Sequence, residues 1–278
     1  MFEGLYEEKY IDVGENHLCY IDAGAGPALI FLHGSGPGVS GLSNFYRNID
    51  HFTKDFRVIV FDFPGFGKSS KPVIPIDTLF AYFGDTVRGA MDALGIDKAH
   101  FVGNSLGGAV ALRVALDEPA KVDRLVLMGS GGGVSTITAQ PAEGIRHLIN
   151  YYDGEGPTRE KLREFINVMV YDPSQVGEDL FEHRYQASID PEVVANPLFN
   201  RSRIPGAERL FPDVRDVRQK TLIVWGRDDR TMTVDQSLFM LAQMPDVQLH
   251  IFGQCGHWSQ WEKAQEFNVL VHGFLTGK

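Results

Sequence analysis

The sequence predicts an α/β fold in which a mostly parallel sheet of eight strands is covered by helices on both faces. Short apolar runs alternate with stretches of helical periodicity, which is typical of parallel strands buried on both sides. A charged, helix-rich segment interrupts this alternation in the second half of the chain. With 278 residues, 44% hydrophobic and 22% charged, the chain is long enough to bury one sizeable core.

Eight short segments carry the strand prediction. Residues 8–13 and 17–23 alternate in polarity on either side of a turn at Gly14–Glu15–Asn16, and therefore predict an opening antiparallel hairpin. Six apolar runs that we expect to be strands follow, at 28–32, 57–61, 100–102, 124–128, 222–225 and 248–252. Helical periodicity predicts helices over roughly 76–94, 105–117, 235–244 and 259–275.

Residues 134–206 do not show this alternation of strand and helix patterns. The segment starts after a run of glycines that ends at Gly133, stops near Pro205–Gly206, and contains helical patterns but no strong strand pattern. One crossover between parallel strands does not need so many residues. We therefore predict a helical lid over 134–206, inserted into a core formed by 1–133 and 207–278. Plain crossover helices are the alternative.

The segment Gly103-Asn104-Ser105-Leu106-Gly107 carries the pattern G-x-S-x-G. It follows a predicted strand and opens a predicted helix, which is the setting that a nucleophile elbow requires. The serine then sits on a tight turn, and the helix N-terminus directs amide donors toward developing negative charge. We predict that Ser105 is a nucleophile; an ordinary strand–helix turn is the alternative.

A serine hydroxyl needs a base, and the base needs an orienting acid. With such an elbow, the chain order is serine, then acid, then histidine. Asp228 and Asp229 follow the strand predicted at 222–225, and the usual G-x-x-D spacing favours Asp229. His257 lies after the last predicted strand, on the loop before the final helix. We predict it as the base; a surface or core imidazole is the alternative.

A glycine-rich loop, His33-Gly34-Ser35-Gly36-Pro37-Gly38, follows the strand predicted at 28–32. Glycines there let a backbone N–H reach a developing oxyanion, and the N–H of Leu106 is the expected second donor. A flexible connector is the alternative. We interpret the turn at 62–69 as structural, because it closes the strand at 57–61.

The chain resembles the α/β-hydrolase superfamily from end to end, and several motifs resemble the meta-cleavage product hydrolases within it. These motifs are HGSGPG followed by SNFYRN at 43–48, GNSLGG, RLVLMG with its glycine run, NVMVYD at 167–172, Arg184-Tyr185, and GQCGHWSQWEK at 253–263. The Asn before the serine and the His-Trp pair are much more specific than G-x-S-x-G. That family cleaves a carbon–carbon bond in 2-hydroxy-6-oxo-hexa-2,4-dienoates, the ring-opened products of extradiol catechol dioxygenases.

The resemblance implies a role for each matching residue. It implies a catalytic triad, which consists of Ser105, Asp229 and His257. It implies a group of side chains that hold the dienoate end with its carboxylate and 2-oxo group: Asn44, Asn104, Arg184 and Trp258. It implies that the oxyanion region is lined by Ser35, Gly36 and Leu106. Many relatives have glycine in place of Ser35, whose side chain narrows the site slightly and adds a hydroxyl.

Several of these side chains have structural alternatives. Arg184 supplies a planar fork suited to a carboxylate, but it could also be a solvated charge or pair with Glu182. Asn104 could stabilise the elbow, and Trp258 could pack in the core. Trp261 is expected to pack on the last helix.

The implied reaction starts with protonation of the carbon between the diene and the ketone, with His257 as the proton carrier. Ser105 then attacks the ketone, 2-hydroxypenta-2,4-dienoate departs, and water releases a carboxylic acid. A carboxylesterase is the alternative enzyme. Dehalogenases and epoxide hydrolases carry an aspartate at the elbow, and a non-catalytic receptor would tolerate a damaged triad, so Ser105 and the complete triad argue against these classes. The substituent on the ketone, whether alkyl, phenyl or a fused ring, stays open.

Composition limits the partners. The net charge of −10 argues against nucleic acid or an anionic membrane surface. Cys19 and Cys255 lie far apart in the sequence and show no metal-like spacing, so we expect no disulfide framework, which fits a reducing cytosol. We also expect no metal and no cofactor. The acidic N-terminus has no apolar run, and no stretch is long enough to cross a membrane, so we expect no signal peptide and a cytoplasmic location. Relatives with this loop pattern are commonly dimers or larger, so we expect a homo-oligomer that binds a small anionic dienoate.

Overall fold

The computed structural model describes residues 4–132, 136–200, 208–210 and 213–277. The strands form one eight-stranded sheet in the order β1-β2-β4-β3-β5-β6-β7-β8. Their bounds are β1 Lys9–Val13, β2 Asn16–Ala23, β3 Ala28–Leu32, β4 Arg57–Phe61, β5 Ala99–Asn104, β6 Val122–Met128, β7 Lys220–Gly226 and β8 Val247–Phe252. β2 runs antiparallel to both β1 and β4, and all other neighbours are parallel. The predicted fold class, including the opening hairpin, is confirmed.

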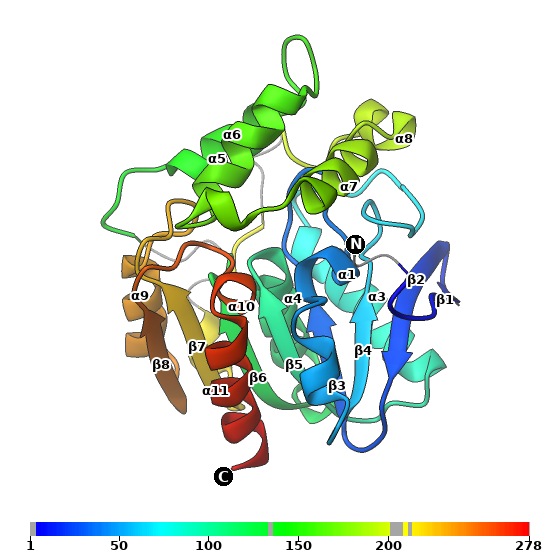
Figure 1. The fold of residues 1–278 in the computed structure, drawn as a ribbon. Coiled ribbons are helices and arrows are strands. Elements are labelled where there is room, and N and C mark those ends of the chain that lie inside the picture. The colour runs from blue at the N-terminus through cyan, green and yellow to red at the C-terminus, as the bar shows by residue number, and fades with distance from the viewer. Residues whose placement is uncertain (1–3, 133–135, 201–207, 211–212, 278) are drawn as a thin grey trace.

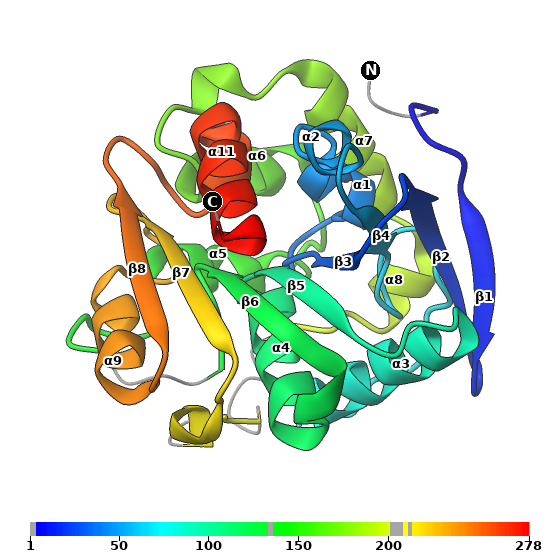
Figure 2. The same cartoon turned by 90° about the horizontal axis from the view of Figure 1, so that it is seen from below.

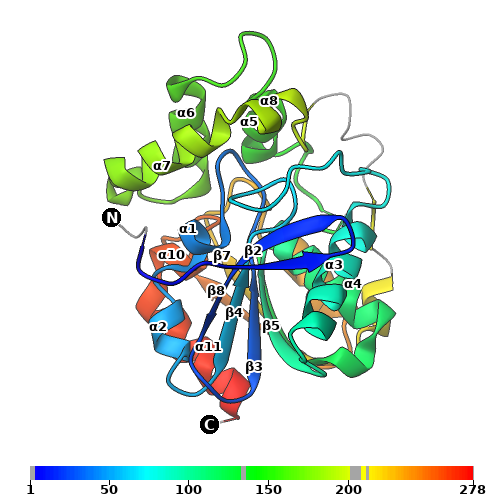
Figure 3. The same cartoon turned by 90° about the vertical axis from the view of Figure 1, so that its right-hand side faces the viewer.

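Helices cover both faces of the sheet (Figures 2 and 3). One face carries α3 Leu79–Ala93, α4 Leu106–Asp117 and α9 Asp235–Gln243, and the other carries α1 Gly41–Phe45, α2 Ile49–Phe52, α10 Ser259–Glu262 and α11 Ala264–Thr276. Each face has its own apolar core. Because side chains alternate along a strand, neighbouring residues such as Ile30 and Phe31 bury into opposite cores.

In its described part, the segment between β6 and β7 contains four α-helices, which we call the helical insertion: α5 Glu143–Asn150, α6 Arg159–Met169, α7 Glu178–Ser188 and α8 Pro191–Ala195. It lies beyond the carboxyl ends of the strands (Figure 1). Leu148, Phe165 and Phe181 join the same core as α1 and α11. The predicted boundaries of the segment, at 134 and 206, lie outside the described residues. Short 3-10 turns span Pro119–Lys121, Pro173–Gln175 and Asp213–Asp216.

The expectation of one helix over 259–275 is wrong, because the chain breaks between α10 and α11 at Lys263 (φ −115°, ψ 40°). Two carbonyls of α10 accept side-chain hydrogen bonds from the α1–α2 region: Gln260 O from Asn48 Nδ2 at 2.9 Å, and Trp261 O from Arg47 Nη1 at 3.0 Å. These bonds replace continued helical pairing at this point. Sequence periodicity cannot detect such distant partners.

Cys19 and Cys255 are both free and buried. Among the residues with described positions, no group of histidine, cysteine or acidic side chains is arranged to hold a metal ion. Within the same residues, no helix is both long and apolar enough to cross a bilayer.

Candidate active site

Ser105 occupies the turn between β5 and α4, where the carboxyl ends of the central strands meet. Its backbone has φ 52° and ψ −111°, in a region that side-chain-bearing residues rarely adopt. The Ser105 N–H donates to Met128 O at 2.8 Å, and the Gly131 N–H donates to Ser105 O at 3.0 Å. The turn is therefore fixed against the end of β6.

Small residues allow this tight turn to form. A Cβ atom on Gly103 would lie 2.4 Å from Gly107 O, and one on Gly107 would lie 2.0 Å from Leu32 O. Only glycine fits at either place, since such contacts are far shorter than van der Waals distance. The G-x-S-x-G pattern thus reflects close packing of β5, α4 and the end of β3.

Asp229 and His257 come from the loops after β7 and β8, and the fold brings them together. His257 Nδ1 lies 2.7 Å from Asp229 Oδ2, and both side chains are buried. Asp229 Oδ1 accepts two backbone bonds, from Thr231 N–H at 2.7 Å and Met232 N–H at 2.9 Å. The carboxylate is therefore held in one orientation toward the imidazole.

Asp228, the other candidate for the acid, points elsewhere. Its carboxylate pairs with Arg227 at 3.2 Å near the surface and lies 3.4 Å from the Cys255 N–H. The G-x-x-D spacing therefore selects the aspartate that contacts the histidine.

The glycine-rich stretch after β6 lies beneath the imidazole and beside Ser105. A Cβ atom on Gly129 would lie 2.8 Å from His257 Nδ1 and 3.3 Å from Asp229 Oδ2. Gly131, two residues on, is hydrogen-bonded to Ser105. The three predicted triad residues therefore border one short stretch of backbone. His257 Nε2 is buried and has no hydrogen-bond partner among the described residues, Ser105 included.

The glycine-rich loop after β3 approaches Ser105 at Gly34. A Cβ atom there would lie 3.2 Å from Ser105 Cβ and 2.9 Å from Asn104 Oδ1. Ser35 follows and is half-buried, and Leu106 is buried at the first position of α4. The first backbone N–H groups of a helix have no partner inside it. The loop and the start of α4 thus lie on either side of the nucleophile.

Burial of His33 stabilises the start of this loop. Its Nδ1 lies 2.6 Å from Gly34 O, and its Nε2 accepts the Phe63 N–H at 3.0 Å. Complete burial lowers the pKa of His33 to about 4, so the ring is neutral and serves both bonds. The turn after β4 is structural as predicted, since buried Asp62 accepts the Gly41 N–H at 2.6 Å and the Lys68 N–H at 2.9 Å.

Arg184 comes from α7 of the helical insertion and is only 3% exposed. Its Nε donates to Pro37 O at 3.0 Å, and its Nη2 has no partner within the described residues. A Cβ atom on Gly36 would lie 3.1 Å from Nη2 and 3.0 Å from Phe165. Burial lowers the pKa of Arg184 to about 10, which still leaves it charged at neutral pH. Glu182 instead pairs with Arg159, at 2.6 Å.

Trp258 and the two asparagines complete the set of predicted substrate contacts. The ring of Trp258 lies under the Arg184 guanidinium, with its centre 4.8 Å from Cζ. Asn104 is buried beside Ser105 and donates to Met128 O at 3.4 Å. Asn44, on α1, is buried, and its Nδ2 has no hydrogen-bond partner in the part of the chain that the structure describes; its backbone carbonyl accepts a hydrogen bond from Gln260 Nε2 on α10 at 3.4 Å. Buried donors without partners are costly unless a ligand satisfies them.

Trp261 departs in part from expectation. It belongs to the core that includes residues of α11, but its indole N–H donates to Tyr46 Oη at 3.0 Å and Arg47 stacks on its ring at 3.8 Å. Trp261 therefore fixes the segment that directly follows α1, and α1 itself carries Asn44.

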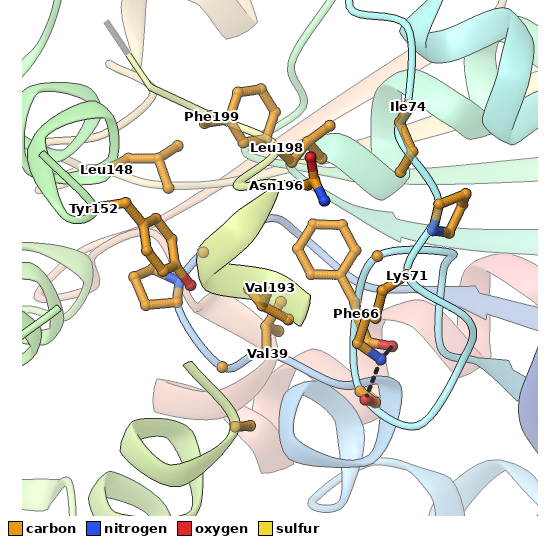
Figure 4. Close-up of a pocket in the computed structure, with 17 residues that line it drawn as sticks. Val39, Phe66, Lys71, Ile74, Leu148, Tyr152, Val193, Asn196, Leu198 and Phe199 are labelled. Atoms are coloured by element: carbon orange, nitrogen blue, oxygen red, sulfur yellow. Dashed lines mark hydrogen bonds between the residues drawn. The ribbon is translucent and has the colours of Figure 1, made fainter. Parts of the chain in front are cut away.

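A cavity of about 40 Å³ is bordered by Gly36, Pro37 and Gly38 of the loop after β3. Its walls are mainly apolar and include Val39, Phe66, Ile74, Leu148, Val193 and Phe199 (Figure 4). Lys71 borders it, but its Nζ donates to the carbonyls of the 66–69 turn, including Gly67 O at 2.8 Å. The ammonium group of Lys71 is therefore already hydrogen-bonded to backbone carbonyls of the protein.

Sequence reasoning missed several contributors to this site. They are Gly129 and Gly131, which act through backbone atoms or through the space that they leave, and Pro37, which belongs to the predicted loop but whose carbonyl contact with Arg184 was not expected. The glycines of the loops after β3 and β6 were the available signal, but which glycine faces which side chain depends on the packing of separate loops.

The chain is similar in sequence to one protein family and to several known hydrolases. The alpha/beta hydrolase fold family matches residues 27–151 and 170–264. The chain is 43% identical to a 2-hydroxy-6-oxononadienedioate/2-hydroxy-6-oxononatrienedioate hydrolase of Comamonas testosteroni and 43% identical to a 2-hydroxy-6-oxo-6-phenylhexa-2,4-dienoate hydrolase of Burkholderia cepacia, in each case over 96% of both chains.

Solved structures agree. A meta-cleavage product hydrolase from Pseudomonas fluorescens, a serine-to-alanine mutant complexed with acetates, superposes with a TM-score of 0.87 at 35% identity over 97% of both chains. The 2-hydroxy-6-oxo-6-phenylhexa-2,4-dienoate hydrolase of a Rhodococcus strain gives 0.87 at 28% identity, over 98% of this chain and 99% of the other.

Proposed function

Because the chain belongs to the alpha/beta hydrolase fold family and, within it, to the meta-cleavage product hydrolases, we propose that it hydrolyses a carbon–carbon bond in 2-hydroxy-6-oxo-hexa-2,4-dienoates. The products are 2-hydroxypenta-2,4-dienoate and a carboxylic acid, as in the breakdown of aromatic compounds. The observation that carries the proposal is Arg184, a buried cation whose Nη2 lies at Gly36, on the loop that approaches Ser105, and has no hydrogen-bond partner among the described residues. Hydrolysis of a neutral ester gives no reason to bury it.

In this proposal the dienoate carboxylate binds Arg184, whose planar fork offers donors in one plane. Asn44 Nδ2 donates to the same end of the substrate, and Asn104 and Trp258 line it. Since the chain carries a net charge of −10, a local buried cation rather than the overall field attracts the anion. The 2-hydroxy-6-oxo-dienoate portion common to the relatives' substrates is the part that these residues recognise.

Catalysis then follows from the triad geometry. His257 carries the proton of the substrate's 2-hydroxyl to the carbon between the diene and the ketone, which gives the 2-oxo tautomer and leaves the imidazole neutral. The proton that His257 next takes from Ser105 is passed to the departing fragment, which leaves as the enol 2-hydroxypenta-2,4-dienoate. Ser105 Oγ attacks the ketone carbon while His257 Nε2 accepts its proton and Asp229 orients the ring. The oxyanion is stabilised by backbone donors from the 34–36 loop and from Leu106. The carbon–carbon bond breaks to give an acyl-enzyme, which water activated by His257 hydrolyses to the acid.

The helical insertion has a defined part in this scheme. It supplies Arg184, and Phe165 from α6 packs at Gly36. We propose that residues 134–206 act as a lid that excludes water from the substrate while the carbon between the diene and the ketone is protonated. We also expect a homo-oligomer in the cytoplasm; light scattering of the purified protein and cell fractionation test these two expectations.

The decisive experiment compares kcat/KM on a 6-phenyl dienoate with kcat/KM on p-nitrophenyl acetate, with products identified by mass spectrometry. The proposal expects the dienoate to be strongly preferred and benzoate to form together with 2-hydroxypenta-2,4-dienoate. A panel of dienoates with graded 6-substituents extends the test. Efficient hydrolysis of the ester, with no carbon–carbon cleavage of any dienoate in the panel, would make the protein a carboxylesterase instead.

A further inference from the structure

Glu262, at the end of α10, lies five residues after His257 and turns back toward it. Its Oε1 accepts the N–H of Gly256 at 2.8 Å, and its Oε2 accepts the N–H of Tyr171 at 2.6 Å. Gly256 directly precedes the histidine, whereas Tyr171 follows α6 of the helical insertion. One half-buried carboxylate thus joins two segments that are far apart in the sequence.

The two segments that Glu262 joins are in direct backbone contact. The N–H of His257 donates to Met169 O at 2.7 Å. A Cβ atom on Gly256 would lie 2.7 Å from Met169 O and 2.9 Å from Tyr171 N, so only glycine allows the chains to approach this closely. The residues that follow α6 therefore form the support on which the histidine loop rests.

The same end of α6 also contacts the loop of the triad aspartate. Arg230 donates to Asn167 O, and the Thr231 hydroxyl lies 3.2 Å from Met169 Sδ. Thr231 in turn donates its N–H to Asp229. The segment 167–171 is therefore bound to the acid loop on one side and to the base loop on the other, and Glu262 secures the second attachment.

We propose that Glu262 is a positioning residue that ties the His257 loop to the end of α6 and so sets the place of His257 relative to Ser105. This inference rests on the proposed function only in assigning the reaction; the link between Glu262 and His257 is a matter of geometry. It also gives a purpose to two sequence motifs, NVMVYD and the Glu of GHWSQWEK, that contribute no side chain to the proposed chemistry.

The state of Glu262 depends on the groups that face it. Burial raises the pKa of Glu262 to about 7, and the nearby carboxylate of Asp229 acts in the same direction. The N–H groups of Tyr171 and Gly256, which donate to its two oxygens, favour the ionised form and partly offset this rise. The other nearby titratable groups are the Cys255 thiol at 3.9 Å, whose own pKa is raised by burial, and Asp228 and Lys263, which act on that thiol. Protonation of Glu262 would turn one of its acceptor oxygens into an O–H group that faces an N–H group. The hydrogen bonds that join the two segments therefore weaken below neutral pH.

The test uses Glu262→Ala and Glu262→Gln, with Glu266→Gln on the exposed side of α11 as the matched control. The readouts are kcat and KM on a dienoate and on p-nitrophenyl acetate, the rate of labelling of Ser105 by a fluorophosphonate, and the thermal midpoint. We expect Glu262→Ala to lower kcat and the labelling rate by about 10-fold or more with little change in KM, since small displacements of a catalytic group are costly. The control should match the parent.

The pH profile separates positioning from a merely structural role. In the parent, protonation of Glu262 weakens its hydrogen bonds to the His257 loop and to Tyr171, and so lowers the rate as pH falls. Glutamine does not titrate, so the acid limb of log kcat should be shallower in Glu262→Gln than in the parent. Gln retains the side-chain shape, so it decides the question even if the alanine variant does not fold.

Parent-like kcat, labelling rate and acid limb in a folded Glu262→Gln would overturn the inference, as would a loss confined to thermal stability. The labelling and ester readouts need no dienoate. If the parent cleaves no dienoate, the proposed function fails while these readouts still decide the role of Glu262.

Discussion

The guanidinium of Arg184 stacks over the ring of Trp258, with Cζ 4.8 Å from the ring centre. The arginine belongs to the helical insertion, whereas the tryptophan directly follows the histidine of the predicted triad. A desolvated cation–π contact of this kind contributes about 2 kcal/mol. It also orients the planar fork, so Nη2 is held in place before any anion arrives.

Replacing Arg184 by Ala should raise KM for a dienoate by about 10–100-fold, because a buried hydrogen bond to a charged group contributes roughly 1.5–3 kcal/mol. Hydrolysis of p-nitrophenyl acetate should change little, since this neutral ester needs no anion clamp. Arg163→Ala is the control, because Arg163 is another arginine of the insertion but pairs with exposed Glu178. Equal losses on both substrates would assign Arg184 a structural role at Pro37.

Asn substitutions should distinguish the two neighbouring aspartates. Asp229→Asn is expected to lower kcat by about 10⁴-fold, because an amide favours the wrong imidazole tautomer. Asp228→Asn should leave kcat within a few-fold, since Asp228 pairs with Arg227 near the surface. Steady-state kinetics of both variants test this assignment, and a reversed order of effects would contradict it.

The backbone of Ser105 predicts a stability effect. At φ 52° and ψ −111°, a residue with a side chain stores about 1–3 kcal/mol of strain, part of which glycine relieves. Glycine also gains entropy in the unfolded chain, which costs about 0.5–1 kcal/mol. We therefore expect Ser105→Gly to unfold with a free energy about 1 kcal/mol higher than Ser105→Ala. Urea titrations compare the two inactive variants, and greater stability of the alanine variant would argue against strain at the turn.

His33 predicts a pH dependence of stability. Its pKa is lowered from 6.5 to about 4 in the fold, so the unfolded chain binds the proton more readily. The stability linked to His33 is fully present above pH 6.5 and is lost as pH falls from 6.5 toward 4. The loss amounts to about 3 kcal/mol in total, since one pH unit corresponds to roughly 1.4 kcal/mol.

Urea unfolding at several pH values tests this in the parent and in His33→Asn. Asn offers a donor and an acceptor but does not titrate, so the difference in unfolding free energy between the two proteins should shrink below pH 6.5. A difference that stays constant down to pH 4.5 would mean that His33 is not held neutral by the fold.

The sequence was sufficient to predict the strands and to predict which candidate site residues directly follow them. Parallel strands end at one edge of the sheet, so residues placed just after strands, such as Ser105, Asp229 and His257, can be expected to meet there. Even the choice between Asp228 and Asp229 followed from spacing. These features are local, and local patterns are what a single sequence records.

What could not be predicted depends on contacts between distant segments. The break at Lys263 depends on side chains near α1, and the tie through Glu262 depends on how α6 rests on the histidine loop. No periodicity or spacing encodes such distant partners. The five-residue helix α1 is a different case, because it is too short to show periodicity and is fixed by a local capping box between Ser40 and Ser43.

The most direct test of the central claim measures cleavage of a 6-phenyl dienoate by the parent and by Ser105→Ala, following loss of the dienolate absorbance and formation of benzoate. The account predicts that the variant still binds the dienoate, because Arg184 and Trp258 are untouched, but forms benzoate at least about 10³-fold more slowly. Benzoate formation near the parent rate in Ser105→Ala would contradict nucleophilic attack by this serine.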